Sequence, residues 1–350
     1  MEKIKVLVVD DSPVVRSIVS ETLATEPRID VVGCAEDPYE ARDLIKKLNP
    51  DVLTLDVEMP KMDGITFLKN LMRLRPMPVV MLSSLTTKGS DVTLDALSLG
   101  AVDFIAKPSS DSVGRLDTFT TELVSKVLAA AKAKIGPKNT PAPVSVVQRE
   151  ASAADHKTVI AIGASTGGTE AIAEVLSRLP GNLPPVVITQ HIPPKFSERF
   201  ALRLDGLSEL KVCEAKDGQM IRPGHAYVAP GDKHFVITST ANGLVGRLSD
   251  AEPVNRHKPS VDVMFSSLAE LKGYGVCAVI LTGMGKDGAQ GMLELQRTGA
   301  LTIGQDEATC VVYGMPKAAY DLGGVDKVVG LSQVADVVLR HLAVSSKKVS

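Results

Sequence analysis

Aromatic residues are scarce in this chain: they make up 3% of its 350 residues, and tryptophan is absent. Its hydrophobic cores must therefore be built from Val, Leu, Ile, Ala and Met, which favours parallel sheets covered by helices over a β-sandwich. The hydrophobic fraction of 44% and the charged fraction of 23% are close to those of ordinary globular proteins. Neither a disordered nor a fibrous chain is indicated.

Closely spaced cysteine pairs, a large net charge and long apolar runs are lacking as well. The four cysteines (Cys34, Cys213, Cys277 and Cys310) show no C-x-x-C spacing, which argues against zinc and against a disulfide framework. The formal net charge of -2 and the absence of a basic run leave no electrostatic footprint for nucleic acid. No apolar run reaches the length of a membrane span, and the start M-E-K-I-K-V-L-V-V-D-D lacks the apolar stretch of a signal peptide. We expect a cytoplasmic protein.

The length and the pattern of the chain predict two α/β domains. From residue 4 to about 130, five short apolar runs alternate with five helical segments, which predicts a doubly wound parallel sheet. Prolines at 137, 141 and 143 and a polar stretch then interrupt the alternation. We place a first domain at 1–130, a linker at 131–156 and a second domain at 157–350.

The second half resumes the alternation with one irregular region. Runs at 158–163, 185–190, 276–283, 301–304 and 326–330 are typical of buried parallel strands, with helical sequence between them. Between 211 and 250 the apolar runs are short and bounded by turns, with A-N-G at 241–243. This region predicts antiparallel strands or a hairpin attached to a mostly parallel sheet.

Charged and hydroxyl side chains end several strands of the first domain. Asp10 and Asp11 follow the first strand, Asp56 ends the third, Ser83 ends the fourth and Lys107 follows the fifth. Since the carboxyl ends of parallel strands share one edge, these groups should converge. Three carboxylates repel one another unless a cation such as Mg²⁺ lies among them, and a carboxylate beside cations can accept a phosphoryl group. Helix capping explains such aspartates singly, but it does not explain Asp56 together with Lys107.

These residues resemble the receiver domain of two-component response regulators over residues 1 to about 125. The matching features are the acidic pair at 10–11, D-V-E-M-P from 56, M-D-G at 62–64, Ser83 and the K-P at 107. The resemblance implies a flavodoxin-like sheet of five parallel strands and phosphorylation of Asp56. It also implies Mg²⁺ held by Asp10, Asp11, Asp56 and the backbone carbonyl of Glu58, with Ser83 and Lys107 in support.

The second domain opens with G-A-S-T-G at 163–167, between a predicted strand and a predicted helix. Such a turn can present the Ser165 hydroxyl as a nucleophile near unpaired backbone N–H groups. It can equally form a loop that binds phosphate. Neither G-x-G-x-x-G nor the lysine of a P-loop is present, so the motif alone leaves both possibilities open.

A nucleophilic serine needs a base, and the strand-edge rule selects His191, which follows the strand after the one that carries Ser165. His225 and His234 begin short strands, and His341 lies in the last helix. His257, in the polar stretch N-R-H-K-P-S-V-D before a predicted helix, is the rival.

A carboxylate should orient the base, and two aspartates follow strands at the same edge. Asp287 is favoured because glycines at 283, 285, 288 and 291 let the backbone fold closely around a site and present N–H groups to an oxyanion. Asp306 stays an alternative.

Residues 157 to about 345 resemble the catalytic domain of the CheB family, the chemotaxis response-regulator protein-glutamate methylesterases. The matching stretches are G-A-S-T-G-G, Q-H-I-P-P-K-F, H-K-P-S-V-D, L-T-G-M-G-K-D-G and V-V-Y-G-M-P-K-A-A. The resemblance implies that Ser165 is the nucleophile, His191 the general base, Asp287 its partner and the Met284 N–H an oxyanion donor, with no cofactor for hydrolysis.

The same resemblance implies what this protein acts on and what controls it. Methyl esters of glutamate on methyl-accepting chemoreceptors would be hydrolysed, and similar enzymes also deamidate receptor glutamines. The chemotaxis histidine kinase would phosphorylate the receiver, which blocks the esterase cleft until then. Contact with a membrane would be only through the receptor. The alternative is a response regulator whose second domain is a non-catalytic signalling or docking module.

Overall fold

The computed structural model describes residues 2–84, 86–107, 116–133, 135 and 157–349. The chain divides into two compact units, Met1–Asn139 and Thr140–Ser350, which are described separately. The linker expected at 131–156 lies for most of its length outside the described residues. None of the helices in the described ranges is long and apolar enough to cross a membrane.

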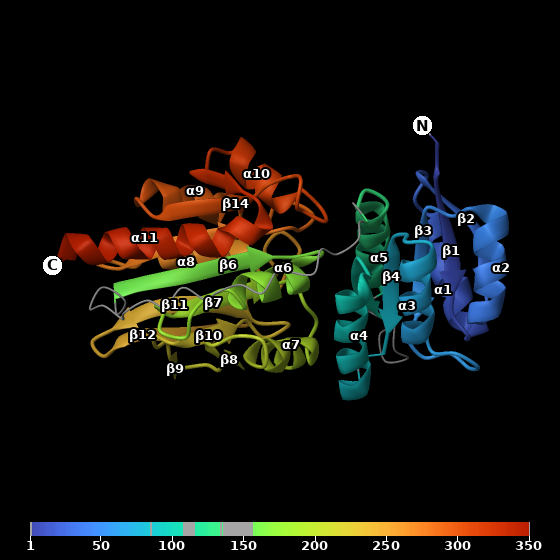
Figure 1. Cartoon of the computed structure of the whole chain (residues 1–350), viewed down its shortest axis with the longest axis horizontal. Coiled ribbons are helices and arrows are strands. Elements are labelled where there is room, and N and C mark those ends of the chain that lie inside the picture. Colours follow the sequence, from blue (N-terminus) through green and yellow to red (C-terminus); the bar gives the residue numbers. More distant parts are fainter. Residues whose placement is uncertain (1, 85, 108–115, 134, 136–156, 350) are drawn as a thin grey trace. The chain divides into compact units, whose positions relative to one another are not determined.

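The first unit is a parallel sheet of five strands in the order β2-β1-β3-β4-β5, which confirms the flavodoxin-like prediction (Figure 1). Its strands are β1 (Ile4–Val9), β2 (Ile29–Ala35), β3 (Val52–Asp56), β4 (Val79–Ser83) and β5 (Asp103–Ala106). A helix follows each strand: α1 (Pro13–Ala24), α2 (Pro38–Leu48), α3 (Gly64–Leu74), α4 (Thr87–Leu99) and α5 (Leu116–Ala130). Helix α1 packs beside α5, and α3 packs beside α4.

The central strands β3 and β4 are buried along their whole length, as expected of apolar runs covered on both faces. Helix caps account for other polar residues near the strand ends. Ser12 accepts a hydrogen bond from a backbone N–H in the first turn of α1, and Asp37 and Asp63 do so for α2 and α3. Asp10 and Asp56 cap no helix, so capping does not explain their position.

The second unit is built on a parallel sheet of seven strands in the order β15-β14-β13-β6-β7-β10-β8. Its strands are β6 (Thr158–Ala164), β7 (Val186–Gln190), β8 (Lys211–Glu214), β10 (His225–Val228), β13 (Gly275–Ile280), β14 (Leu301–Gln305) and β15 (Lys327–Val329). The helices are α6 (Gly168–Leu176), α7 (Phe196–Asp205), α8 (Val261–Ala269), α9 (Ala289–Arg297), α10 (Met315–Asp321), the 3₁₀ turn η2 (Leu331–Gln333) and α11 (Val334–Val349). Helices α8, α9 and α10 pack in one row, and α11, α6 and α7 in another.

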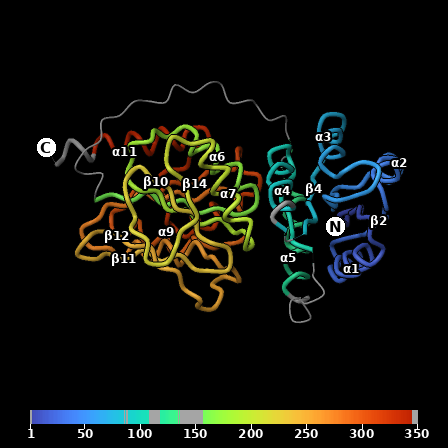
Figure 2. The backbone as a smooth tube through the Cα atoms, turned by 90° about the horizontal axis from the view of Figure 1, so that it is seen from below, coloured from blue at the N-terminus to red at the C-terminus, as the bar shows by residue number. Residues whose placement is uncertain are grey.

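Among the strands of the described residues, those that pair antiparallel form a smaller sheet with the order β11-β12-β9. Strands β11 (His234–Thr240) and β12 (Gly243–Ser249) form the expected hairpin and lie side by side in both views (Figure 1, Figure 2), and β9 is Gln219–Met220. The antiparallel prediction is wrong for 211–214 and 225–228, because β8 and β10 extend the parallel sheet. Four-residue runs bounded by turns carry no signal for the direction of pairing.

Sheet register brings distant parts of the second unit to one edge. Ala164 at the end of β6 pairs with Gln190 at the end of β7, and Gly163 pairs with Ile280 at the end of β13. The segments that follow these three strands therefore leave the sheet beside one another.

Candidate functional site

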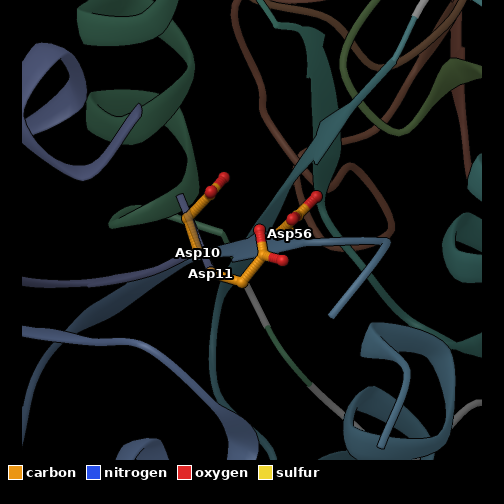
Figure 3. A group of neighbouring side chains, drawn as sticks. All are labelled: Asp10, Asp11 and Asp56. Atoms are coloured by element: carbon orange, nitrogen blue, oxygen red, sulfur yellow. The ribbon is translucent and has the colours of Figure 1, made fainter. Parts of the chain in front are cut away.

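Three carboxylates meet at the carboxyl edge of the first sheet (Figure 3). Asp10 and Asp11 follow β1 and Asp56 ends β3, and one oxygen of each lies within 4.8 Å of the others. Asp10 and Asp56 are buried, whereas Asp11 is exposed. The predicted convergence of these side chains is present.

Lys107 lies between the two buried carboxylates of this cluster. Its Nζ is 2.8 Å from Asp10 Oδ2 and 2.8 Å from Asp56 Oδ1. Burial raises the pKa of the Asp56 carboxyl to about 6; Lys107 opposes this shift and the charge of Asp10 adds to it. Burial disfavours the charge on Lys107, but hydrogen bonds to both carboxylates outweigh it and raise the pKa of the ammonium. The pocket therefore holds a half-buried ammonium beside a buried carboxyl whose pKa is raised to about 6.

Ser83 lies at the same edge, but its hydroxyl is engaged elsewhere. Ser83 Oγ accepts a hydrogen bond from Thr93 Oγ1 at 2.6 Å and lies 3.3 Å from the Gly89 carbonyl, both in α4. The backbone N–H of Lys107 donates to the Ser83 carbonyl at 2.8 Å. The backbone thus joins β4 to Lys107, while the hydroxyl faces α4.

The donor set fits a divalent cation. Asp56 Oδ2 is buried and has no hydrogen-bond partner among the described residues. An unpartnered buried carboxylate oxygen is costly, and hard oxygen ligands beside an exposed third carboxylate suit a small divalent metal. The N–H of Glu58 donates to Asp56 Oδ1 at 3.3 Å, which keeps the following loop at the pocket.

Ser165 stands at the turn between β6 and α6. Its N–H donates to the Thr282 carbonyl at 3.0 Å, and its own carbonyl accepts from Gln190 Nε2 at 2.9 Å. Gly167 has a φ of +75°, and a Cβ there would lie 2.7 Å from the Val311 side chain, so both the backbone and the packing require glycine. The turn is held rigidly by its backbone, and the Ser165 hydroxyl makes no hydrogen bond within the described ranges.

His191 follows β7 and lies beside this turn, since its N–H donates to the Ala164 carbonyl at 3.2 Å. Its Nε2 is 2.8 Å from Asp287 Oδ2. Its Nδ1 is buried and has no partner in the described part of the chain. An ionised carboxylate can only accept, so we assign the proton to Nε2, which leaves the lone pair on Nδ1.

Asp287 is 1% exposed and is surrounded by hydrogen-bond donors. Its oxygens accept from His191 Nε2, Val261 N, Asn255 Nδ2, Ser260 Oγ and Asp262 N, at distances from 2.7 to 3.3 Å. Burial alone would raise the pKa of this carboxyl, but the bonds from His191, Asn255 and Ser260 outweigh burial and hold the pKa well below its usual range. Asp287 is therefore a carboxylate at neutral pH.

The rival residues occupy other positions. Asp306 accepts from the N–H and the hydroxyl of Thr309, in a local turn. His257 stacks on His191 with ring centroids 3.6 Å apart, and it does not replace His191 at Asp287. His234 is buried and bonds the Glu252 carbonyl, as befits a structural histidine.

The loop after β13 carries Met284 between two glycines. The Gly283 N–H donates to the Val312 carbonyl at 3.1 Å, and the Gly283 carbonyl accepts from Gly314 and Met315. A Cβ on Gly283 would lie 2.8 Å from Ser165 Cβ, so glycine allows this loop to approach the serine. Met284 directly follows Gly283 and is therefore carried close to the Ser165 turn. Its role as an oxyanion donor remains a prediction.

Three residues that contribute to this site are not predicted from the sequence: Gln190, Asn255 and Ser260. Gln190 Nε2 donates to the carbonyls of both Ser165 and His191, at 2.9 and 3.1 Å. Ser260 caps α8, and its hydroxyl also donates to Asp287. In the sequence, Asn255 and Ser260 lie close to the rival histidine, and Gln190 directly precedes His191.

A phosphoacceptor-like acidic pocket on one sheet and a serine, a histidine and an aspartate at the edge of another define a response regulator joined to a hydrolase-like unit. Residues 160–338 match the sequence model of the CheB methylesterase family, and residues 6–115 match that of the response regulator receiver domain. The chain belongs to the CheB methylesterase family and carries an N-terminal receiver domain.

Similar proteins extend over nearly the whole chain. It is 51% identical to a protein-glutamate methylesterase/protein-glutamine glutaminase of Hydrogenovibrio crunogenus, over 97% of this chain and 99% of that one. It is 52% identical to the Pectobacterium atrosepticum protein of the same name, over 98% of each. The second unit resembles the solved CheB methylesterase catalytic domain of Thermotoga maritima, with a TM-score of 0.51, 36% identity and coverage of 55% of this chain and 99% of that one.

Proposed function

We propose that this protein hydrolyses γ-glutamyl methyl esters on methyl-accepting chemoreceptors, and that phosphorylation of Asp56 raises the rate. The observation that carries the esterase proposal is the bond between His191 Nε2 and Asp287, because it leaves Nδ1 as a base at the edge where Ser165 stands. The names of the similar proteins support the ester and also a second substrate, the side-chain amide of glutamine. They give no support to a non-catalytic docking module.

In the proposed mechanism His191 Nδ1 takes the hydroxyl proton as Ser165 Oγ attacks the ester carbonyl. Asp287 stays ionised and stabilises the imidazolium that forms. The backbone N–H of Met284 donates to the developing oxyanion. Collapse of the tetrahedral intermediate breaks the bond to methoxide, which leaves as methanol with the proton from Nδ1. Water then repeats these steps on the acyl-enzyme and releases the glutamate carboxylate.

Gln190 supports this arrangement, because one amide group bonds the backbone carbonyls of both Ser165 and His191. It therefore fixes the distance between the turn that carries the proposed nucleophile and the loop that carries the proposed base. Holding reacting groups at the correct distance contributes a large part of the rate acceleration of many enzymes.

In the receiver, Asp56 would accept a phosphoryl group from the histidine kinase of the chemotaxis system. Asp10, Asp11, Asp56 and the backbone carbonyl of Glu58 would hold Mg²⁺, which supplies charge neutralisation for the transferring oxygens when it is bound. Lys107 already contacts Asp56 and would pair with a phosphoryl oxygen, with Ser83 in support.

The proposed function is tested by methanol release from methylated chemoreceptors in membranes, measured with and without a small-molecule phosphodonor. We expect release above the rate without enzyme, and a further increase with the phosphodonor. Release no faster than without enzyme would contradict the esterase proposal and favour the docking module. Equal rates with and without the phosphodonor would contradict regulation only.

Replacing Asp56 by asparagine should remove the response to the phosphodonor and leave basal methanol release unchanged, because the amide is no phosphoryl acceptor. An allosteric coupling of typical strength would stimulate the wild type by roughly 5- to 150-fold. The matched control is Asp30→Asn, an exposed aspartate of β2, which should respond like the wild type. Stimulation of the Asp56→Asn variant would place the phosphoryl group elsewhere.

Binding of Mg²⁺ to the receiver should weaken as the pH falls through about 6, the pKa of Asp56. The proton-bearing carboxyl is a poor ligand, so below that pKa each unit of pH should cost roughly a factor of ten in apparent affinity, and above pH 7 the affinity should level off. Calorimetric titration with MgCl₂ between pH 5 and 8 measures this. An affinity that is constant down to pH 5 would show that Asp56 is ionised throughout.

A further inference from the structure

The loop before α8 contains a tight turn whose geometry is unusual for its sequence. Val254 and His257 pair in both directions, with the His257 N–H donating to the Val254 carbonyl at 2.9 Å and the Val254 N–H donating to the His257 carbonyl at 3.2 Å. The two residues between them, Asn255 and Arg256, have φ values of 52° and 69°. A two-residue loop of this kind favours Asn-Gly, and arginine is a poor occupant of the second position.

Two residues of this turn, Asn255 and His257, reach the proposed catalytic pair. Asn255 Nδ2 donates to Asp287 Oδ1 at 2.9 Å and to Asp262 Oδ2 at 2.7 Å. The ring of His257 lies on the ring of His191, with centroids 3.6 Å apart and planes inclined by 12°. A backbone conformation that is disfavoured for arginine thus coincides with contacts to both members of the pair, and such coincidence points to function.

The orientation of His191 needs more than one contact. The ring is attached to the chain through Cβ, and the single hydrogen bond from Nε2 to Asp287 fixes a second point, which still allows the ring to turn about the line between these two points. A second ring lying flat on its face removes this rotation. Stacked rings at this distance also attract one another, and the face of a neutral ring tolerates the positive charge that His191 acquires when it takes a proton.

We infer that His257 is a positioning residue for the general base: its ring holds His191 in the plane in which Nε2 meets Asp287 and Nδ1 is left to take the proton of Ser165. This inference deepens the proposed esterase function and depends on it. Asn255 fixes the carboxylate from the same turn, so one four-residue segment orients both partners of the pair.

The test compares three variants of His257 by two measurements. Methanol release gives kcat and KM on the methylated receptor, and inactivation by a fluorophosphonate gives the reactivity of Ser165 without any receptor contact. We expect His257→Ala to lower kcat and the inactivation rate at least tenfold with KM within twofold. His257→Phe keeps a flat ring and should stay within threefold of the wild type. His257→Gln keeps polarity without a ring and should behave like His257→Ala.

The matched control is His225→Ala, since His225 is another partly buried histidine that stacks on an aromatic ring, that of Tyr227. It should stay within twofold of the wild type in both measurements. If His257→Ala fails to fold, the comparison of His257→Phe with His257→Gln decides alone. The inference is overturned if His257→Ala stays within twofold, if KM alone rises, or if His257→Gln is active and His257→Phe is not.

The two measurements separate this inference from the proposed function. A wild-type protein that reacts with the fluorophosphonate but releases no methanol would contradict the esterase proposal, and the variants could still be compared by inactivation. A wild type that releases methanol, with His257→Ala unchanged, would contradict the role of His257 alone.

Discussion

Replacing Ser165 by alanine should abolish methanol release from methylated receptors, with a loss of roughly 10⁶-fold in kcat if the residue is the nucleophile of a catalytic triad. The fold should persist, because the Ser165 turn is held by its backbone bonds to Thr282, Gly168 and Gln190. The hydroxyl itself makes no hydrogen bond in the part of the chain described, so its removal leaves no partner unsatisfied. The variant should melt within a few degrees of the wild type.

Two controls make the Ser165→Ala result specific. Ser177→Ala removes another hydroxyl, one that donates to the Glu174 carbonyl at the end of α6, and should stay within twofold of the wild type. Phosphorylation of Asp56 should proceed normally in Ser165→Ala, since that chemistry belongs to the other unit. Fluorophosphonate should label the wild type and not the variant. Methanol release within tenfold of the wild type would remove Ser165 from the mechanism.

Much of both sites was predictable because strand ends are visible in the sequence. Apolar runs locate β6, β7 and β13, and parallel strands carry their carboxyl ends to one edge. This rule alone gathers Ser165, His191 and Asp287, residues that are far apart in the chain. It works equally for Asp56 and Lys107 in the first unit, where the lysine contacts the buried carboxylates directly.

What could not be predicted depends on contacts made outside the sheet. No periodicity reveals that Asn255 and Ser260 donate to Asp287, since both lie in a loop whose path is set by a turn with two left-handed residues. The rotamer of Ser83, which faces α4, is likewise a matter of side-chain packing. That Nε2 and not Nδ1 meets Asp287 depends on the orientation of the His191 ring, which the sequence does not reveal.

The choice between Asp287 and Asp306 also depends on side-chain contacts that the sequence does not show. Asp306 and Asp287 each follow a parallel strand, so the edge rule admits both. The Asp306 side chain accepts a hydrogen bond from Thr309 in a local turn. Asp287 is instead buried beside the start of α8, where Val261 N and Ser260 Oγ donate to it. Sequence shows that two carboxylates reach the edge, but only the positions of the donors tell which of them faces the histidine.

Replacing Asp287 by asparagine should lower kcat by about 10⁴-fold, the cost seen when the carboxylate of a catalytic triad becomes an amide. Every partner of this carboxylate is a donor, so the new NH₂ group must face a donor whichever way it turns. Toward Oδ2 it meets the Val261 N–H and His191 Nε2, and the ring then shifts its proton to Nδ1, where the base is needed. Toward Oδ1 it meets Asn255 and Ser260. A lower melting temperature should accompany the loss of activity.

The matched control for this change is Asp306→Asn, just after a neighbouring strand of the same sheet. It should stay within threefold of the wild type, because among the described residues the Asp306 side chain bonds Thr309 in a local turn. Methanol release measures kcat for both variants, and thermal melting reports their stability. Thermal melting distinguishes a misplaced proton on His191 from unfolding of the protein. If the proton is misplaced, the Asp287→Asn variant should be folded but inactive. More than a tenth of wild-type activity in Asp287→Asn, or an equal loss in Asp306→Asn, would contradict the assignment of Asp287.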